Sequence, residues 1–129
     1  MTATADLPGS ETARAAMVAS QLRTSGVDDA RVVAAMAQVA RERFLPESQR
    51  ALAYRDRSLP LGGGRVQNPP LATGLLLTEA RIGAKDTVLI VGAAGGYAAA
   101  VAARLAAAGT RSYLKRSALP NQDIRFTRR

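Results

Sequence analysis

The 129-residue chain contains no cysteine and no histidine, and these two absences exclude several kinds of site. Without thiols the chain can form no disulfide and no thiol nucleophile, and without imidazoles it cannot build a serine, histidine and aspartate relay. Zinc sites made from cysteine and histidine are excluded for the same reason. The acidic residues show no paired spacing typical of a hydrolase or a metal cage, so we expect no metal site. Any chemistry must use hydroxyls, carboxylates, amides, backbone groups or a bound cofactor.

The chain also lacks long apolar runs. None approaches the roughly 20 residues that cross a bilayer, and residues 1–14 lack the basic start and apolar stretch of a secretory signal. A hydrophobic fraction of 47% and a charged fraction of 22% indicate one modest soluble domain. The sequence therefore predicts a cytoplasmic protein without a membrane partner.

Aromatic residues are scarce, at 4%, although the net charge of +8 invites comparison with nucleic-acid-binding proteins. The positive charge is concentrated at the end, where six of the 18 basic residues follow Gly109 against one acidic residue. A basic face with aromatic platforms for base stacking is not indicated. We therefore expect no nucleic-acid partner. We interpret residues 110–129 as a basic tail, aberrant or disordered, that follows a domain over residues 1–109.

Apolar spacing predicts that the N-terminal segment 10–54 is helical. Ser10 is expected to cap the first helix, which runs to about Thr24, and Gly26 is expected to end it. The further predicted elements are a helix that starts at Asp28 or Asp29, a short helix over 46–54, an irregular glycine loop over 56–70, and a helix from Pro70 with an apolar face of Leu71, Leu75, Leu76 and Ala80.

The last part of the domain, the unit 70–109, continues from that helix into one strand, one tight turn and a second helix. An apolar run, Val88–Val91, breaks at Gly92, and Tyr97 then opens an alanine-rich helix that Gly109 could end. Such a unit presents backbone N–H groups at the carboxyl end of a strand, where open α/β sheets bind nucleotide-like ligands. Because no further strand is recognised, the strand should lack a paired neighbour, and its open edges predict self-association.

The turn consists of Gly92, Ala93, Ala94, Gly95 and Gly96, and its spacing excludes two phosphate-binding loops. The dinucleotide fingerprint needs glycine in place of Ala94 and a small residue just after Gly96, and a Walker loop needs lysine followed by serine or threonine. The spacing is similar to the GxGxG loop of methyltransferases that use S-adenosyl-L-methionine. Side chains there would collide with the methionine and ribose parts of such a cofactor. If Ala94 has a positive φ, it costs about 1 kcal/mol relative to glycine.

The rest of the domain carries short sequence words that occur together, in this order, in one enzyme family. They are Met17-Val18, Gln21-Leu22-Arg23, Gly26-Val27, Arg31-Val32-Val33, Ala35-Met36, Arg41-Glu42-Arg43-Phe44-Leu45-Pro46, Ala53-Tyr54 with Asp56, Leu59-Pro60-Leu61-Gly62-Gly63-Gly64, Asn68-Pro69, Val88-Leu89, Gly92 and Gly96-Tyr97. Several separated words in the right order are more specific than a glycine turn. On these words the chain resembles the protein-L-isoaspartate O-methyltransferases from near Ala15 to about Gly109.

The resemblance implies an α/β fold, the Rossmann-like fold of S-adenosylmethionine-dependent methyltransferases, here with an N-terminal helical segment and only the first strand-turn-helix unit. It implies methyl transfer from S-adenosylmethionine to the α-carboxylate of isoaspartyl residues in damaged proteins, a protein-repair reaction. The carboxylate is already a nucleophile, so positioning and desolvation would supply most of the catalysis. The implied cofactor-binding residues are Gly92, Ala93, Ala94, Gly95 and Gly96, and the implied substrate loop includes Gly62, Gly63, Gly64 and Asn68.

The chain departs from the family's pattern in three ways. Gln67 stands in the slot of the family's active-site serine, which makes it the candidate catalytic position, and its larger amide could alter substrate recognition. Ile90 replaces an acidic residue before the glycine turn. No acid that could bind the ribose follows within roughly 20 residues of the turn, since the family's pattern ends between Gly109 and Ser112.

The chain is therefore interpreted as a shortened family member with an aberrant end of the kind a frameshift produces. Two alternatives stay open beside isoaspartate repair. The chain could be a methyltransferase relative with a changed substrate, or an inactive fragment that acts only as an interaction module.

Overall fold

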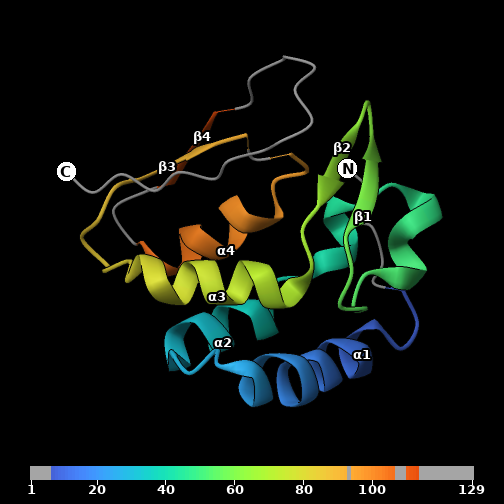
Figure 1. Ribbon diagram of the computed structural model, residues 1–129, viewed down its shortest axis with the longest axis horizontal. Helices are drawn as coiled ribbons and strands as arrows, with labels where there is room; N and C mark the ends of the chain where they lie inside the picture. The colour runs from blue at the N-terminus through green and yellow to red at the C-terminus, as the bar shows by residue number, and fades with distance from the viewer. Residues whose placement is uncertain (1–6, 93, 107–109, 114–129) are drawn as a thin grey trace.

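The computed structural model describes residues 7–92, 94–106 and 110–113, which form a mixed α/β arrangement with two two-stranded sheets (Figure 1). The α-helices are α1 (Ser10–Met17), α2 (Ala30–Gln38), α3 (Pro70–Ala80) and α4 (Tyr97–Leu105). One π-helical turn, η1 (Val18–Leu22), follows α1. The 3₁₀-helical turns are η2 (Arg23–Ser25), η3 (Arg41–Phe44) and η4 (Glu47–Leu52). The strands are β1 (Leu59–Gly62), β2 (Arg65–Gln67), β3 (Val88–Val91) and β4 (Thr110–Tyr113).

The predicted helix over 10–24 forms in three pieces. The α-helix α1 widens into the π-helical turn η1, tightens into the 3₁₀ turn η2, and ends at Gly26, whose φ of 94° is the left-handed conformation expected there. The expected cap at Ser10 is wrong, because Gly9 is the N-cap and Ser10 is the buried first residue of the helix. The second helix starts as predicted, since the Asp29 side chain accepts a hydrogen bond from the Arg31 amide at 2.9 Å.

The main core is shared by the helices and β3. Its fully buried residues include Met36 of α2, Leu77 of α3, Ile90 of β3 and Val101 of α4. In Figure 1, α1 and α2 lie below α3 and α4, and β3 and β4 lie above them. The helix α4 therefore stands between the helical N-terminal segment and the β3–β4 sheet.

Helix α3 packs against η1 and α2, and its buried face differs from the predicted one. Thr73, Gly74 and Leu77 are among its buried residues, whereas Leu75 is 38% exposed. The cause is a close approach at Gly74, where a Cβ atom would lie 2.9 Å from Val27 Cγ2. Leucines lie on every side of this helix, so their spacing does not indicate which side is buried. The small residues decide which side packs against the other helices.

Strand β3 is paired, so the expectation that it lacks a neighbour is wrong. Strand β4 lies parallel to it, in a register that runs from Val88 opposite Thr110 to Val91 opposite Tyr113, and β3–α4–β4 is a βαβ unit. The four residues of β4 thus belong to the fold and not to a tail. Their sequence, Thr-Arg-Ser-Tyr, lacks the apolar run that marks β3. Residues 114–129, the rest of the expected tail, lie outside the described residues.

The segment 56–70, expected to be irregular, contains a β-hairpin. Strands β1 and β2 are antiparallel, with Leu59 opposite Gln67. Gly63 and Gly64 connect the strands with φ values of 61° and 74°, and a two-residue turn with two positive φ angles suits the twist of a hairpin. In Figure 1 the hairpin stands beside the β3–β4 sheet.

Candidate functional site

The glycine turn between β3 and α4 adopts the backbone conformation that its sequence suggests. Gly92 and Gly96 have φ values of 76° and 91°, and Ala94 has a φ of 39°. Ala94 therefore takes a positive φ, the condition under which alanine in place of glycine is costly. Ala93 lies outside the described residues. Because Gly96 is the N-cap of α4, the free amides of this helix begin at the turn.

Position 95 requires glycine because another segment of the chain passes close to it. A Cβ atom on Gly95 would lie 2.6 Å from the backbone oxygen of Phe44 and 3.5 Å from the side chain of Leu61. Contacts of Cβ atoms under 3.0 Å essentially never occur, so a larger residue here requires η3 to move. Room for a cofactor is therefore not the reason for glycine at this position, and a cofactor contact through its backbone stays a prediction.

Arg41, the first residue of η3, is fully buried, although charged residues are rarely so. Its Nε donates to the Ala53 carbonyl at 2.6 Å, and its Nη2 donates to the Asn68 carbonyl at 2.5 Å. Its Cζ lies 4.8 Å from the centre of the Tyr97 ring, in a cation–π contact. Burial lowers the pKa of Arg41 and raises the pKa of Tyr97, and the nearness of the two groups opposes both shifts. The sequence signals Arg41 only as part of a family word.

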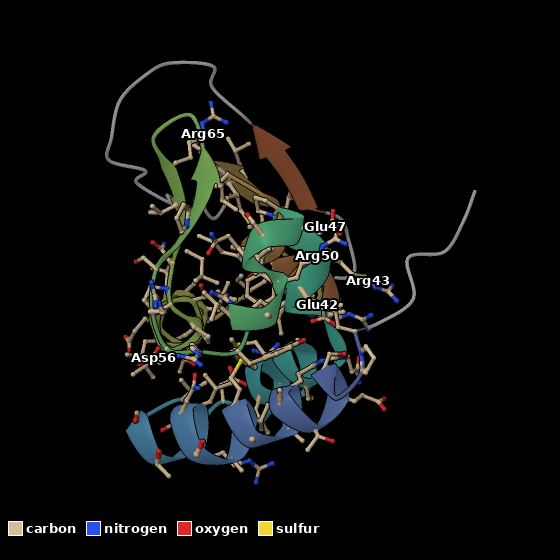
Figure 2. The ribbon with its side chains drawn as sticks, turned by 90° about the vertical axis from the view of Figure 1, so that its right-hand side faces the viewer. Glu42, Arg43, Glu47, Arg50, Asp56 and Arg65 are labelled. Atoms are coloured by element: carbon tan, nitrogen blue, oxygen red, sulfur yellow. The ribbon has the colours of Figure 1, made fainter. Side chains whose placement is uncertain are left out.

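Glu42 anchors η3 to the first helix. Its carboxylate accepts a hydrogen bond from the Tyr54 hydroxyl, and Arg14 of α1 donates from Nε to the same hydroxyl at 2.9 Å. Arg14 Nη2 lies 3.7 Å from Glu42 Oε1. Burial, together with the hydrogen bond to Glu42, raises the pKa of the Tyr54 hydroxyl, so this group keeps its proton further into the alkaline range than a free tyrosine does. Figure 2 shows Glu42 of η3 below Glu47 and Arg50 of η4, whereas Arg65 lies near the end of the hairpin.

Gln67, the predicted catalytic position, is buried, with 5% of its surface exposed. It lies opposite Leu59 in the hairpin, so both side chains face the smaller core cluster that Leu59 forms with Leu45 and Ala53. Neither Nε2 nor Oε1 of Gln67 has a hydrogen-bond partner among the described residues. A buried amide without partners costs about 1–3 kcal/mol. Such a group calls for an explanation, of which a bound molecule is one.

The predicted substrate-loop residues divide into two groups. Asn68 is brought to η3, because its backbone oxygen receives the hydrogen bond from Arg41. Gly62, Gly63 and Gly64 lie exposed at the tip of the hairpin, where a Cβ atom would meet nothing within 4 Å. The structure thus holds Asn68 against η3, whereas the three glycines at the tip of the hairpin project away from other residues.

A separate open groove of about 670 Å³ runs along α1 and η1. It is lined by Glu11, Arg14, Ala15, Val18, Ala19, Arg23 and Ala37, none of which is a predicted site residue. Within residues 7–92, 94–106 and 110–113, no group of three or more acidic, cysteine or histidine side chains could hold a metal ion. The helices in this part of the chain are too short or too polar to cross a membrane.

Comparison with known proteins points to one family. Residues 13–112 match the family model described as protein-L-isoaspartate(D-aspartate) O-methyltransferase, so the match ends within β4. The chain is 45% identical over 98 residues to protein-L-isoaspartate O-methyltransferase 2 of Anaeromyxobacter sp. (strain Fw109-5), which covers 76% of this chain and 40% of that protein. It is 45% identical over 93 residues to protein-L-isoaspartate O-methyltransferase 1 of Rhodopseudomonas palustris (strain HaA2), which covers 72% and 38%. The chain thus spans about two fifths of the length of these curated relatives.

Proposed function

Because the chain belongs to the protein-L-isoaspartate O-methyltransferase family, we propose that the whole protein methylates the α-carboxylate of isoaspartyl residues in damaged proteins, with S-adenosylmethionine as methyl donor. A carboxylate oxygen forms a bond to the methyl carbon while the bond from that carbon to sulfur breaks, which leaves an ester and a neutral thioether. The carboxylate is already the nucleophile, so no proton has to move and no strong base is needed. The chain's own residues contribute positioning and exclusion of water.

The β3–turn–α4 unit is the observation that carries this proposal. Gly92, Ala94 and Gly96 give the turn its positive φ angles at the carboxyl end of β3, where the first amides of α4 are free to bind. Open α/β sheets bind their cofactors at this position. We infer that β3–α4–β4 is the first unit of a Rossmann-like sheet, in which residues 92–96 line the methionine side of S-adenosylmethionine. The burial of Ile90, where the family's pattern has an acid, supports a strand inside such a sheet.

Gln67 is proposed to orient the substrate carboxylate. Its amide can donate a hydrogen bond to a carboxylate oxygen, and its two buried atoms have no partner in the described part of the chain. Asn68 and the tip residues Gly62, Gly63 and Gly64 would surround the isoaspartyl peptide. Because an amide is larger than the serine hydroxyl of the family's pattern, a methyltransferase with a changed substrate is the second candidate function.

Titration calorimetry with S-adenosylmethionine tests the cofactor site. We expect saturable heat from the purified chain, and about tenfold weaker binding in Gly96→Ala, because a side chain strains the turn at the cap of α4. Gly26→Ala is the matched control, since Gly26 has a similar φ of 94° but ends the first helix. It should lower stability and leave the affinity unchanged. A folded chain that gives no heat at millimolar cofactor contradicts the proposed site.

Methyl transfer to a matched pair of peptides tests the substrate. We expect the protein to transfer a labelled methyl group to a peptide with isoaspartate and not to the same peptide with normal aspartate. Gln67→Ser, which supplies the side chain of the family's pattern, should raise the rate on the isoaspartyl peptide. Equal labelling of both peptides would contradict isoaspartyl specificity and favour the changed substrate.

A further inference from the structure

Arg41 joins three segments that lie far apart in the chain. Its Nε and Nη2 hold the carbonyls of Ala53 and Asn68, at 2.6 Å and 2.5 Å, and its Cζ lies 4.8 Å from the centre of the Tyr97 ring. Ala53 follows η4, Asn68 follows β2, and Tyr97 is the first residue of α4. The guanidinium is a planar fork, so two carbonyls held by different nitrogens set its orientation, and the stacked ring sets its position.

The short helix η3 also lies against the glycine turn. The Phe44 backbone oxygen occupies the space beside Gly95, and the Phe44 ring would meet a Cβ atom on Gly96 at 3.7 Å. The rings of Phe44 and Tyr97 meet edge to face, with centroids 5.9 Å apart. Leu61 of β1 approaches the same side of Gly95. Residues of both the hairpin and η3 therefore lie against Gly95 of the turn.

We propose that Arg41 is a positioning residue that couples the β1–β2 hairpin to the glycine turn. A change in the turn that displaces Tyr97 must displace the guanidinium stacked on its ring. The guanidinium in turn holds the Asn68 carbonyl, so the end of β2 that carries Gln67 moves with the turn. Applied to the proposed function, on which this step rests, cofactor bound at the turn orders the hairpin that receives the substrate.

Amide hydrogen exchange without cofactor tests the coupling. Tyr97→Leu removes the ring at α4 and leaves Arg41 in place. We expect the amides of β1 and β2 to exchange about tenfold faster in Tyr97→Leu, and to stay within about twofold of the unaltered chain in Tyr97→Phe, which keeps the ring. Protected amides in α2 report that the variant is folded. Unchanged hairpin exchange in folded Tyr97→Leu would overturn the coupling.

Arg41→Lys provides a second variant, which decides the question where Tyr97→Leu does not fold. Lysine keeps the positive charge near the ring and loses the fork that holds two carbonyls. Hairpin exchange should accelerate while the amides of α4 stay protected. Arg104→Lys is the matched control, because Arg104 is exposed and donates from Nη1 to Gln38 Oε1 at 2.7 Å, which joins α4 to α2. Equal hairpin exchange in the two lysine variants would refute the role of Arg41.

Amide hydrogen exchange with saturating S-adenosylmethionine tests the coupling separately from the proposed function. In the unaltered chain, the cofactor should slow exchange both at the start of α4 and in the hairpin. In Arg41→Lys it should slow exchange at α4 alone, and slowing in the hairpin as well would overturn the proposal. No slowing anywhere would contradict the cofactor site, and the cofactor-free comparison would then decide the coupling by itself.

Discussion

Gln67 buries an amide whose two polar atoms have no partner among the described residues. Methionine has a similar length and no amide to desolvate, so Gln67→Met should raise the free energy of unfolding by about 1–3 kcal/mol. Gln21→Met is the matched control, because Gln21 Nε2 donates to the Tyr54 carbonyl at 2.7 Å and its loss should destabilise the chain. Urea denaturation measures both effects. A loss of stability in Gln67→Met would contradict the absence of a partner.

Gly95 and Gly63 differ in what a side chain would meet. In Gly95→Ala the new Cβ atom would lie 2.6 Å from a backbone oxygen that cannot rotate away, and overpacking of this kind costs about 3 kcal/mol. In Gly63→Ala the space is open and only the φ of 61° opposes the change, at about 1 kcal/mol. We therefore expect Gly95→Ala to destabilise the chain more in urea denaturation. The reverse order would mean that η3 shifts at little cost.

Among the elements, α1, η3 and the turn that follows η4 are joined by the partly buried network of Arg14, Glu42 and Tyr54. Burial and the hydrogen bond to Glu42 raise the pKa of Tyr54 in the folded protein. The unfolded chain has an ordinary tyrosine pKa of about 10 and loses this proton first. The folded state then binds more protons than the unfolded state, so the stability of the network is complete below about pH 10 and falls above it.

We expect the free energy of unfolding to decrease as the pH rises above about 10, with a smaller decrease in Tyr54→Phe. Burial also raises the pKa of Tyr97, so part of the decrease should persist in that variant. Urea denaturation over a series of alkaline pH values gives the two slopes. Identical slopes for the variant and the unaltered chain would contradict a raised Tyr54 pKa.

Elements with a local signal could be predicted from the sequence. Asp29 caps α2, Gly26 ends the first helix, and the apolar run Val88–Val91 forms β3. Strand β4 could not be predicted, because Thr110–Tyr113 has no apolar run and is a strand through its pairing with β3. The hairpin did carry a signal, two adjacent glycines between short extended runs, but its dense glycine and proline content favoured an irregular loop.

The candidate site divides in the same way. The positive φ of Ala94 follows from its place in a glycine pattern, which is a local property. The burial of Arg41 does not, because its hydrogen-bond partners Ala53 and Asn68 lie 12 and 27 residues away. The reason for Gly95 is equally remote in the chain, since the atom that crowds it belongs to Phe44. Sequence patterns therefore predict the backbone of the turn better than the side chains around it.

In the whole molecule, the β3–β4 sheet presents one face to the core. Val88 and Ile90 are buried with the helices, whereas Leu89, which points to the opposite face, is 40% exposed. Within the described ranges the sheet has two strands, so each of them has an open edge. Open edges and exposed apolar side chains favour pairing of one chain with another.

We therefore predict that the chain self-associates as its concentration rises, and that Leu89→Lys shifts it toward the monomer. Sedimentation velocity over a concentration series measures the change. Leu75→Lys is the matched control, because Leu75 is 38% exposed on α3, away from the sheet. Equal effects of the two substitutions would place the interface elsewhere, and a monomer at every concentration would contradict self-association.

The contact of the Phe44 backbone oxygen with Gly95 ties the evolution of two segments together. No substitution at Phe44 removes its backbone oxygen. A residue larger than glycine can therefore be accepted at position 95 only after η3 has shifted away from the turn. The Leu61 side chain would meet a Cβ atom at this position at 3.5 Å, an ordinary van der Waals contact, so the hairpin would not have to move. The side chain of Gln67 takes no part in this contact. Under the proposed function, substrate preference can therefore diverge at Gln67 while the proposed cofactor turn is inherited unchanged.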